Sequence, residues 1–316
     1  MTGRSDRVAR PIFLIGMGRS GSTVVFECLA SHRDLGWFAH HANRAPAQCW
    51  RYGLSRVCDV LPTSRKAIER SDQRRSWLEK LRIGPAEAYE TWDHLVGDKL
   101  RASWLIGERA DDAERERVHA YVADVLRWCG KPRFAAKLTG PPRIEYLASL
   151  FPDASFVHVM RDGRAVATSL LRVGFWRDGP RMEEPAWRGG PPEAYLALWR
   201  ELDRSPLALA ALQWRFAIET ARREAAALEP GRYQELRYEA FLDDPAATLA
   251  DLLRRCELPP CSRVERFLGA RFEVRDRNAS ARARLSPQDK EILERTIGPT
   301  LRELGYAVEA TPSSSS

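Results

Sequence analysis

Long apolar runs are missing from this sequence of 316 residues. No segment approaches the roughly 18 uninterrupted apolar residues of a membrane-spanning helix. The first ten residues also lack the apolar stretch of a secretory signal. We therefore expect a soluble, cytoplasmic protein without a membrane span.

Cysteines are few, and none of them is paired in a recognisable motif. The sequence contains no CxxC pair and no metal-ligand spacing, and its six cysteines are Cys28, Cys49, Cys58, Cys129, Cys256 and Cys261. We interpret them as mostly reduced, structural residues, and we expect no metal site.

Runs of charge of one sign are also absent, although the net charge is +7. Basic residues alternate with acidic ones, as in residues 111–117, which is typical of a solvated helix face. A basic surplus favours an anionic partner, which could be a nucleic acid, a membrane surface or a phosphorylated cofactor. Because no basic run is present, we expect no nucleic acid partner.

What the sequence does contain is a repeated order of short apolar segment, turn and helix. Apolar segments at 12–15, 134–137 and 155–160, and a further short one at 234–238, are expected to be strands. The helices expected after them cover residues 22–30, 144–151, 165–171 and 246–255. Strands that alternate with helices predict an α/β fold with a central parallel sheet and right-handed crossovers.

Two long stretches, at about 43–131 and 174–228, lack this order and are interpreted as mainly helical insertions in a single domain. The second is expected to begin as a loop and to continue as a helix around Trp214. Insertions beside such a sheet often form the pocket for a substrate. The domain is expected to span residues 11–308, between a flexible segment 1–10 and a disordered tail 309–316.

The glycine-rich segment 16–23 lies between the first expected strand and the first helix. Free backbone N–H groups and the positive end of the helix dipole favour an anion at such a place. The spacing resembles a Walker A loop, but Ser22 stands at the lysine position and the basic residue is Arg19. A kinase would also need a carboxylate to hold magnesium. Asp162 is the candidate, but the arginines around it suit an anion better than a cation. A glycine-rich turn without a ligand is the structural alternative.

A second anion-binding arrangement follows the strand at 155–160. Arg161 comes directly after that strand, and Ser169 lies about two turns into the following helix. An arginine at a strand end and a hydroxyl on the next helix can hold one phosphate from two sides. The alternative is an ordinary Arg–Asp ion pair beside a surface serine.

Together these segments resemble the two signature motifs of the sulfotransferases. Residues 11–23 resemble the loop for the 5′-phosphosulfate, and residues 156–169 resemble the motif for the 3′-phosphate. Residues 236–245 and 304–306 are also similar to family segments. The form of the loop is more similar to the bacterial and tyrosylprotein branches than to the cytosolic aryl branch. The resemblance implies a P-loop NTPase-like fold and transfer of a sulfuryl group from 3′-phosphoadenosine 5′-phosphosulfate (PAPS), without a metal.

The resemblance also implies roles for individual residues. The 5′-phosphosulfate would be held by Gly18, Arg19, Ser20, Gly21, Ser22 and Thr23, the 3′-phosphate by Arg161 and Ser169, and the adenine would lie near Tyr238. Lys137 matches a family lysine that approaches the transferring group. Arg19 and Lys137 are expected to stabilise the negative charge that develops on the leaving oxygen. Arg282 and Arg284 lie where the family often has a basic residue over the donor.

The acceptor hydroxyl must lose a proton to a base. In the tyrosylprotein branch, which the chain resembles, this base is a glutamate after the first helix. Residues 35–44 contain no carboxylate, but they contain His40 and His41. A histidine is a suitable base near neutral pH. Our hypothesis from the sequence is that His40 is the base, with His41 as the second candidate.

The acceptor is not identified by the sequence beyond a hydroxyl or an amine of a small molecule, lipid or glycan. Five aromatic residues either line its pocket or belong to the scaffold: Trp37, Phe38, Trp50, Trp176 and Trp187. A magnesium-dependent P-loop kinase and a nucleotide-binding protein without catalytic activity remain as alternatives, and a homo-oligomer stays open.

Overall fold

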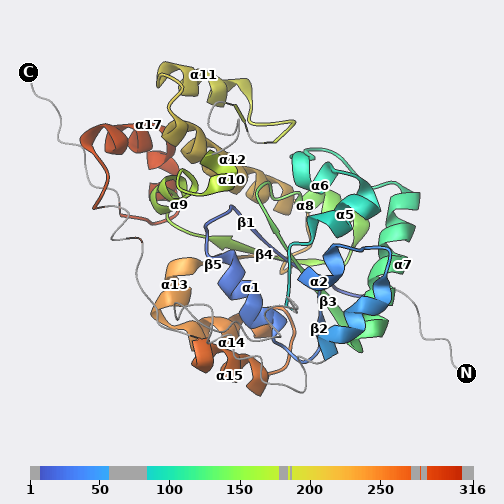
Figure 1. Cartoon of the computed structure of the whole chain (residues 1–316). Coiled ribbons are helices and arrows are strands. Elements are labelled where there is room, and N and C mark those ends of the chain that lie inside the picture. The colour runs from blue at the N-terminus through green and yellow to red at the C-terminus, as the bar shows by residue number, and fades with distance from the viewer. Residues whose placement is uncertain are drawn as a thin grey trace, which may run out of the picture.

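The computed structural model describes residues 8–56, 84–177, 184–185, 187–271, 278 and 283–307, and of residues 175, 177, 270 and 271 it describes the backbone alone. Within these residues the chain forms one central sheet with helices around it (Figure 1). The expected tail 309–316 lies outside the described residues.

The sheet of the described residues has five strands in the order β2-β3-β1-β4-β5, and all of its pairings are parallel. Its strands are β1 (Ile12–Gly16), β2 (Leu35–Gly36), β3 (Arg133–Thr139), β4 (Ser155–Met160) and β5 (Tyr233–Arg237). The α/β fold with a parallel sheet is therefore confirmed. Strand β2 was not expected from the sequence, because two residues are too few to show a period.

Helices cover both faces of this sheet. They are α1 (Ser22–Ala30), α2 (His40–Asn43), α5 (Tyr89–Val96), α6 (Lys99–Ala102), α7 (Asp112–Cys129), α8 (Ile144–Leu150), α9 (Gly163–Leu170), α10 (Gly174–Arg177), α11 (Glu193–Glu201), α12 (Pro206–Ala225), α13 (Tyr238–Asp243), α14 (Pro245–Arg255), α15 (Ser262–Arg271) and α17 (Pro287–Glu303), with a 3₁₀-helix η1 (Cys49–Arg56). Helix α1 packs on β1 and β3, and α14 and α15 pack on α1. Helix α12 packs on α8, α9 and α17.

The order of elements explains how distant residues come together. Strand β1 is buried along its whole length and lies between β3 and β4, so the turns after these three strands meet at one edge of the sheet. The described part of the first insertion contains η1, α5, α6 and α7, and the second contains α10, α11 and α12. Trp214 lies in α12, as the sequence predicts.

Two boundaries differ from the sequence-based expectation. Val8 is buried in the core, inside the segment 1–10 that was expected to be flexible. Tyr238 begins α13 and does not end a strand. The neighbouring strand β4 ends at Met160, which pairs with Arg237. Tyr238 therefore has no strand residue beside it.

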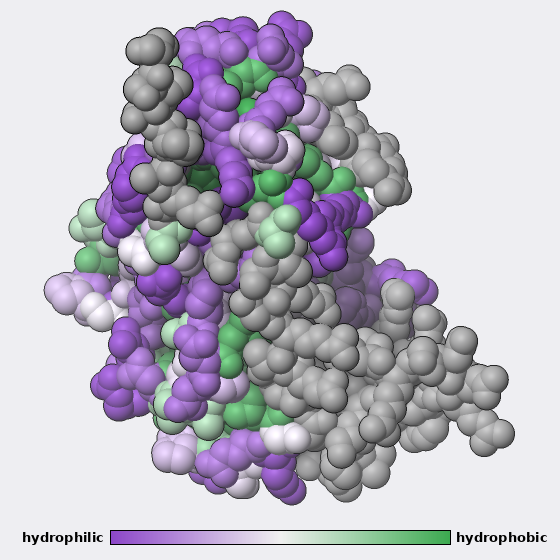
Figure 2. Space-filling model, turned by 90° about the vertical axis from the view of Figure 1, so that its left-hand side faces the viewer, coloured by the Kyte–Doolittle hydropathy of each residue, from purple (hydrophilic) through white to green (hydrophobic). Residues whose placement is uncertain are grey.

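Hydrophilic side chains cover most of the coloured surface on the face shown in Figure 2, and apolar residues show in small patches between them. This surface agrees with a chain in which 29% of the residues are charged. None of the described helices is long and apolar enough to cross a membrane.

A buried carboxyl group connects α12 to the beginning of α8. Oε2 of Glu224 accepts the N–H groups of Ile144 (2.6 Å) and Glu145 (3.2 Å), while Oε1 is buried without a hydrogen-bond partner among the described residues. Burial raises the pKa of Glu224 to about 7. The folded state therefore favours the protonated carboxyl group of Glu224. The resulting contribution to the free energy of unfolding is lost as the pH rises through about 7.

Replacing Glu224 by Gln should remove this pH dependence. Between pH 5 and 8, the free energy of unfolding of the wild type should fall relative to that of Glu224→Gln, by an amount of the order of 3 kcal/mol. The measurement is urea unfolding of both proteins across this range, with exposed Glu116→Gln as the control. Burial also lowers the pKa of His158 to about 4, so this residue makes the free energy of unfolding rise with pH. The comparison with Glu224→Gln removes that contribution, because both proteins contain His158. A constant difference between the two proteins would contradict the assignment.

Candidate active site

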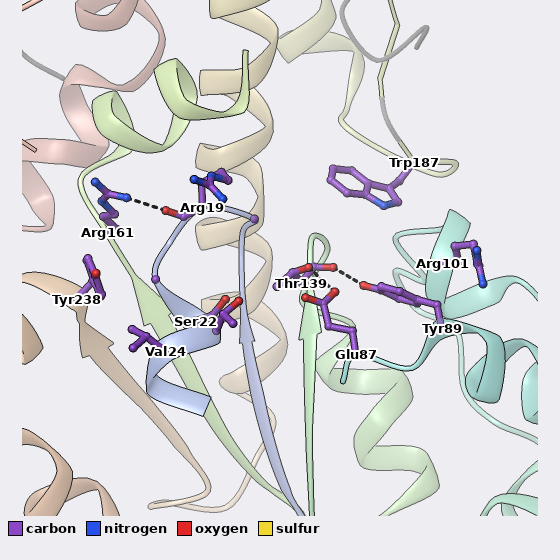
Figure 3. A pocket seen from close by; sticks show the side chains of 13 residues that line it. Arg19, Ser22, Val24, Glu87, Tyr89, Arg101, Thr139, Arg161, Trp187 and Tyr238 are labelled. Atoms are coloured by element: carbon purple, nitrogen blue, oxygen red, sulfur yellow. Dashed lines mark hydrogen bonds between the residues drawn. The ribbon is translucent and has the colours of Figure 1, made fainter. Parts of the chain in front are cut away.

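A cavity of about 570 Å³ opens where the strands β1, β3, β4 and β5 end (Figure 3). One half is lined by the turn after β1 and by Arg161 and Tyr238, which follow β4 and β5. The other half is lined by Glu87, Tyr89, Arg101, Thr139 and Trp187. Cavities at this edge of a parallel sheet are the usual ligand sites of the α/β folds.

The turn after β1 leads directly into α1. Gly21 precedes the helix with φ of 84°, and a Cβ atom there would lie 2.2 Å from the ring of Tyr238, so the position requires glycine. The first hydrogen bonds inside the helix are those of Val24 and Val25 to the carbonyl of Gly21. The N–H groups of Ser22 and Thr23 therefore have no acceptor inside the helix, which suits an anion at this end of the cavity.

Arg19, Arg161 and Ser169 meet beside this turn. Nε of Arg19 donates to Oγ of Ser169 (2.9 Å), and Nη1 of Arg161 donates to the carbonyl of Arg19 (3.0 Å). The guanidinium of Arg161 lies 5.4 Å from the ring centre of Tyr238. Burial lowers the pKa of Arg161 from its usual value. The structure thus brings together the two motifs, which lie more than a hundred residues apart in the sequence.

Arg161 is held in place by a chain of buried and half-buried polar groups that the sequence does not reveal. Its Nε donates to Oδ1 of Asn278 (2.7 Å), whose Nδ2 donates to Glu239 (2.8 Å). Tyr306 donates to the other oxygen of Glu239 (3.1 Å). Asn278 lies four residues before Arg282, in the segment where the family resemblance implied a basic residue over the donor. The sequence therefore indicated this segment, but it did not indicate the asparagine.

Asp162, the carboxylate weighed for magnesium, is engaged elsewhere. It accepts the backbone N–H of Arg164 at the start of α9 (3.0 Å) and forms an ion pair with the guanidinium of the same residue (2.8 Å). Within the described residues, no group of three or more His, Cys, Asp and Glu side chains is arranged to hold a metal ion.

Lys137 connects the two halves of the cavity. Its Nζ donates to Oγ1 of Thr23 (2.8 Å) and pairs with Oε1 of Glu87 (2.8 Å). The hydroxyl of Thr139 donates to Oε2 of Glu87 (2.7 Å). The side chain of Lys137 is 7% exposed and that of Glu87 is 25% exposed, so the carboxylate is the more accessible partner.

Glu87 was not identified from the sequence. It belongs to the first insertion, fifty residues before Lys137, and no motif surrounds it. Its position results from tertiary contacts: the N–H of Ala86 donates to the carbonyl of Phe38 (2.8 Å), which ties this segment to the chain after β2. Sequence patterns carry no signal for such a contact.

Several residues proposed from the sequence do not line the cavity. His40 is exposed, and His41 contacts the carbonyl of Arg51 through Nε2 (2.9 Å). Ser20 is 1% exposed and its N–H donates to Met17, while Arg284 is exposed. Arg282 lies outside the described residues. The structure therefore brings neither histidine to the cavity.

The aromatic residues of the sequence analysis separate into scaffold and site. Trp37, Phe38 and Trp176 are buried, and Trp50 is 54% exposed. Of the five, Trp187 lines the cavity.

Comparison with known proteins identifies the family of the chain. The family model described as "Sulfotransferase family" matches residues 11–262. The fold is similar to that of the sulfotransferase STF9 from Mycobacterium avium (TM-score 0.58, 18% identity, 96% of this chain and 79% of that chain). It is also similar to the sulfotransferase domain from the curacin biosynthetic pathway (TM-score 0.50, 14% identity, 96% of this chain and 99% of that chain).

A relative in sequence is an uncharacterized protein of Aquifex aeolicus, 22% identical over 281 residues. These residues make up 87% of this chain and 29% of that protein, so the chain spans less than a third of its length. The match of the family model over most of the chain decides the assignment, and the resemblance found in the sequence is confirmed. The chain belongs to the sulfotransferase family.

Proposed function

We propose that this protein transfers a sulfuryl group from PAPS to a hydroxyl group of an acceptor. The observation that carries the proposal is the contact of Arg19, Ser169 and Arg161 beside the beginning of α1. This arrangement offers two anion sites next to each other, as a donor with phosphates at both ends of its ribose requires.

In this proposal the turn after β1 binds the 5′-phosphosulfate with the N–H groups of Ser22 and Thr23. Arg161 and the hydroxyl of Ser169 bind the 3′-phosphate, because both groups are hydrogen-bond donors at one place. Tyr238 packs on Gly21 and beside Arg161, so its ring is suited to contact the adenine.

The transfer itself needs cations near the bond that breaks. As the sulfur–oxygen bond breaks, negative charge develops on the oxygen that stays with the 5′-phosphate. Lys137 reaches Thr23 in the donor half and Glu87 in the other half, which supports a position of its ammonium between donor and acceptor in this proposal. We assign it and Arg19 to the stabilisation of this charge.

For the base we propose Glu87 in place of His40 and His41. A base must come within hydrogen-bond reach of the acceptor hydroxyl, and Glu87 lines the cavity next to Lys137. Tyr89 is the other titratable oxygen nearby, but burial raises its pKa to about 12 and its hydroxyl donates to the carbonyl of Thr139 (2.9 Å). Tyr89 therefore stays protonated.

The proposed donor site is tested by the binding of adenosine 3′,5′-bisphosphate, measured by titration calorimetry without magnesium. Arg161→Gln should weaken this binding about 10- to 100-fold, because charged hydrogen bonds to a phosphate contribute about 1.5–3 kcal/mol. Exposed Arg172→Gln is the matched control and should bind as the wild type does. Binding of ATP that requires magnesium, with no binding of the bisphosphate, would favour a kinase and overturn the proposal.

A further inference from the structure

The guanidinium of Arg161 is held from three directions. Its Nε donates to Oδ1 of Asn278 (2.7 Å), its Nη1 donates to the carbonyl of Arg19 (3.0 Å), and its Cζ lies 5.4 Å from the ring centre of Tyr238. Figure 3 shows the bond to Arg19 as a dashed line, with Tyr238 on the same side of the cavity. A long side chain that is already held in this way loses little rotamer freedom when an anion binds to it.

The contact between Arg161 and Asn278 has a defined direction. Nδ2 of Asn278 donates to Oε1 of Glu239 (2.8 Å), and an ionised carboxylate can only accept. Nε of Arg161 can only donate, so its partner must be the amide oxygen. The two neighbours therefore select one of the two orientations of the amide, the one in which Oδ1 faces the arginine. Asn278 is 3% exposed, so both of its bonds are shielded from water.

Glu239 is the anchor of this arrangement. Besides Nδ2 of Asn278, its Oε1 accepts the backbone N–H of Asp162 (3.0 Å), and its Oε2 accepts the hydroxyl of Tyr306 (3.1 Å). Burial raises the pKa of Tyr306, so this hydroxyl keeps its proton and remains a donor. Three donors that converge on one carboxylate fix its position.

These contacts close a ring around Arg161. Asp162 follows Arg161 in the chain, so the N–H that Glu239 accepts belongs to the peptide group directly after Arg161. Glu239 thus holds the backbone of Arg161 directly and its guanidinium through Asn278. Because both ends of the arginine side chain are tied to the same carboxylate, its direction relative to the end of β4 is fixed.

Tyr306 connects this ring to the end of α17. The Cζ of Arg237 lies 4.3 Å from the ring centre of Tyr306, and Nη1 of Arg237 donates to the carbonyl of Leu304 (3.3 Å), which follows α17 directly. Groups that follow β4, β5 and α17 therefore meet at one carboxylate. A buried polar network whose members are bonded to one another makes a site rigid.

We propose that Asn278 and Glu239 are positioning residues for the 3′-phosphate of the donor, because they hold the guanidinium of Arg161 in the direction in which it binds this phosphate. The inference rests on the proposed function, in which Arg161 and Ser169 bind the 3′-phosphate. Neither Asn278 nor Glu239 lines the cavity, so both act through Arg161. Their effect is therefore confined to ligands that carry a 3′-phosphate.

The test compares two ligands that differ in this phosphate alone. Adenosine 3′,5′-bisphosphate and adenosine 5′-monophosphate are titrated into the full chain, and the ratio of their dissociation constants isolates the effect of the 3′-phosphate. In the wild type the bisphosphate should bind at least about tenfold more tightly than the monophosphate. Asn278→Leu removes both hydrogen bonds at similar volume. It should reduce this advantage about tenfold, as loss of an outer hydrogen-bond partner does at metal sites, and leave the affinity for the monophosphate unchanged.

Variants of Glu239 separate orientation from charge. Glu239→Gln keeps one oxygen for Asn278 and Asp162, and its NH2 group can donate to the hydroxyl of Tyr306, so the advantage of the bisphosphate should stay within about threefold of the wild type. Glu239→Leu offers no acceptor and should reduce the advantage as Asn278→Leu does.

Gln48→Leu is the matched control. Oε1 of Gln48 also accepts the Nε of an arginine (Arg51, 2.7 Å), and neither of these residues lines the cavity. This variant loses the same kind of hydrogen bond elsewhere on the molecule. It should bind both nucleotides as the wild type does.

A double variant tests whether Asn278 acts through Arg161. If it does, Arg161→Gln/Asn278→Leu should bind the bisphosphate as Arg161→Gln alone does, whereas independent roles would make the two losses multiply. In turnover, KM for PAPS should rise in Asn278→Leu and kcat at saturating PAPS should change much less, because the 3′-phosphate is bound alike before and during transfer.

The outcomes separate this inference from the proposed function. Equal losses for both nucleotides in Asn278→Leu, an unchanged ratio, or losses that multiply in the double variant would overturn the positioning role and leave the donor site standing. A wild type that binds the bisphosphate no more tightly than the monophosphate would overturn the proposed donor, and the inference with it. If Asn278→Leu fails to fold, Asn278→Ser, whose short side chain cannot bridge Arg161 and Glu239, provides the same comparison.

Discussion

Glu87→Gln is expected to lower kcat for sulfuryl transfer by about 10²- to 10⁴-fold, the usual contribution of a general base. Glutamine keeps the length of the side chain and one acceptor oxygen for Lys137, and its NH2 group can donate to the hydroxyl of Thr139, but it cannot take the acceptor's proton. Binding of adenosine 3′,5′-bisphosphate should stay close to that of the wild type, because Glu87 lies in the opposite half of the cavity. The measurement is turnover at saturating PAPS and acceptor, with the melting temperature as a check on folding.

The role of Glu87 as a base has a sharper signature than a loss of rate. With an acceptor whose hydroxyl is already ionised at the assay pH, no proton remains to be removed, so the loss caused by Glu87→Gln should shrink. Exposed Glu116→Gln is the matched control and should not affect turnover with either acceptor. Equal losses for the neutral and the ionised acceptor would indicate a structural role and contradict the assignment.

The histidines of the sequence hypothesis provide the complementary experiment. His40→Asn and His41→Asn should retain turnover, because neither side chain lines the cavity. Loss of activity in His40→Asn with full activity in Glu87→Gln would restore the original hypothesis.

The parallel sheet was predictable because its strands are local signals. In β1 and β4 an apolar run ends at a turn and a helix follows, so both the element and its direction are visible in a short window. Strand β2 has two residues and depends on its pairing with β3 (Leu35 with Arg133). Such an element is set by tertiary contact, and no local pattern announces it.

The same distinction divides the candidate site. Arg161 adjoins the end of β4 and Arg19 lies in the turn after β1, so topology places them together, and the structure joins them by a hydrogen bond (3.0 Å). Glu87 and Asn278 are positioned by contacts across the fold, and neither adjoins one of the five described strands. The position of a catalytic carboxylate in an insertion depends on how that insertion packs, and the local sequence does not encode this.

Lys137→Met is the second change for which we expect a large effect, a loss of kcat of about 10²- to 10³-fold. Methionine fills a similar volume without the charge, so the oxygen that becomes negative as the sulfur–oxygen bond breaks loses its nearest proposed cation. Because this charge exists only in the transition state, the affinity for adenosine 3′,5′-bisphosphate should change much less than kcat. Turnover and calorimetric binding measure the two quantities, and Lys99→Met is the matched control, since Lys99 also pairs with a glutamate (Glu114, 2.5 Å), but one that does not line the cavity.

Lys137 contacts both Thr23 and Glu87, so the loss of activity in Lys137→Met has two explanations. A single variant does not separate them. If the ammonium merely holds Glu87 in place, the double variant Lys137→Met/Glu87→Gln should be no slower than Glu87→Gln alone. If it stabilises the leaving oxygen, the two losses should multiply, because base and leaving-group stabilisation act at opposite ends of the transferring group. We expect the losses to multiply. A double variant as active as Glu87→Gln would reduce Lys137 to a positioning residue and leave Arg19 as the proposed cation at the leaving oxygen.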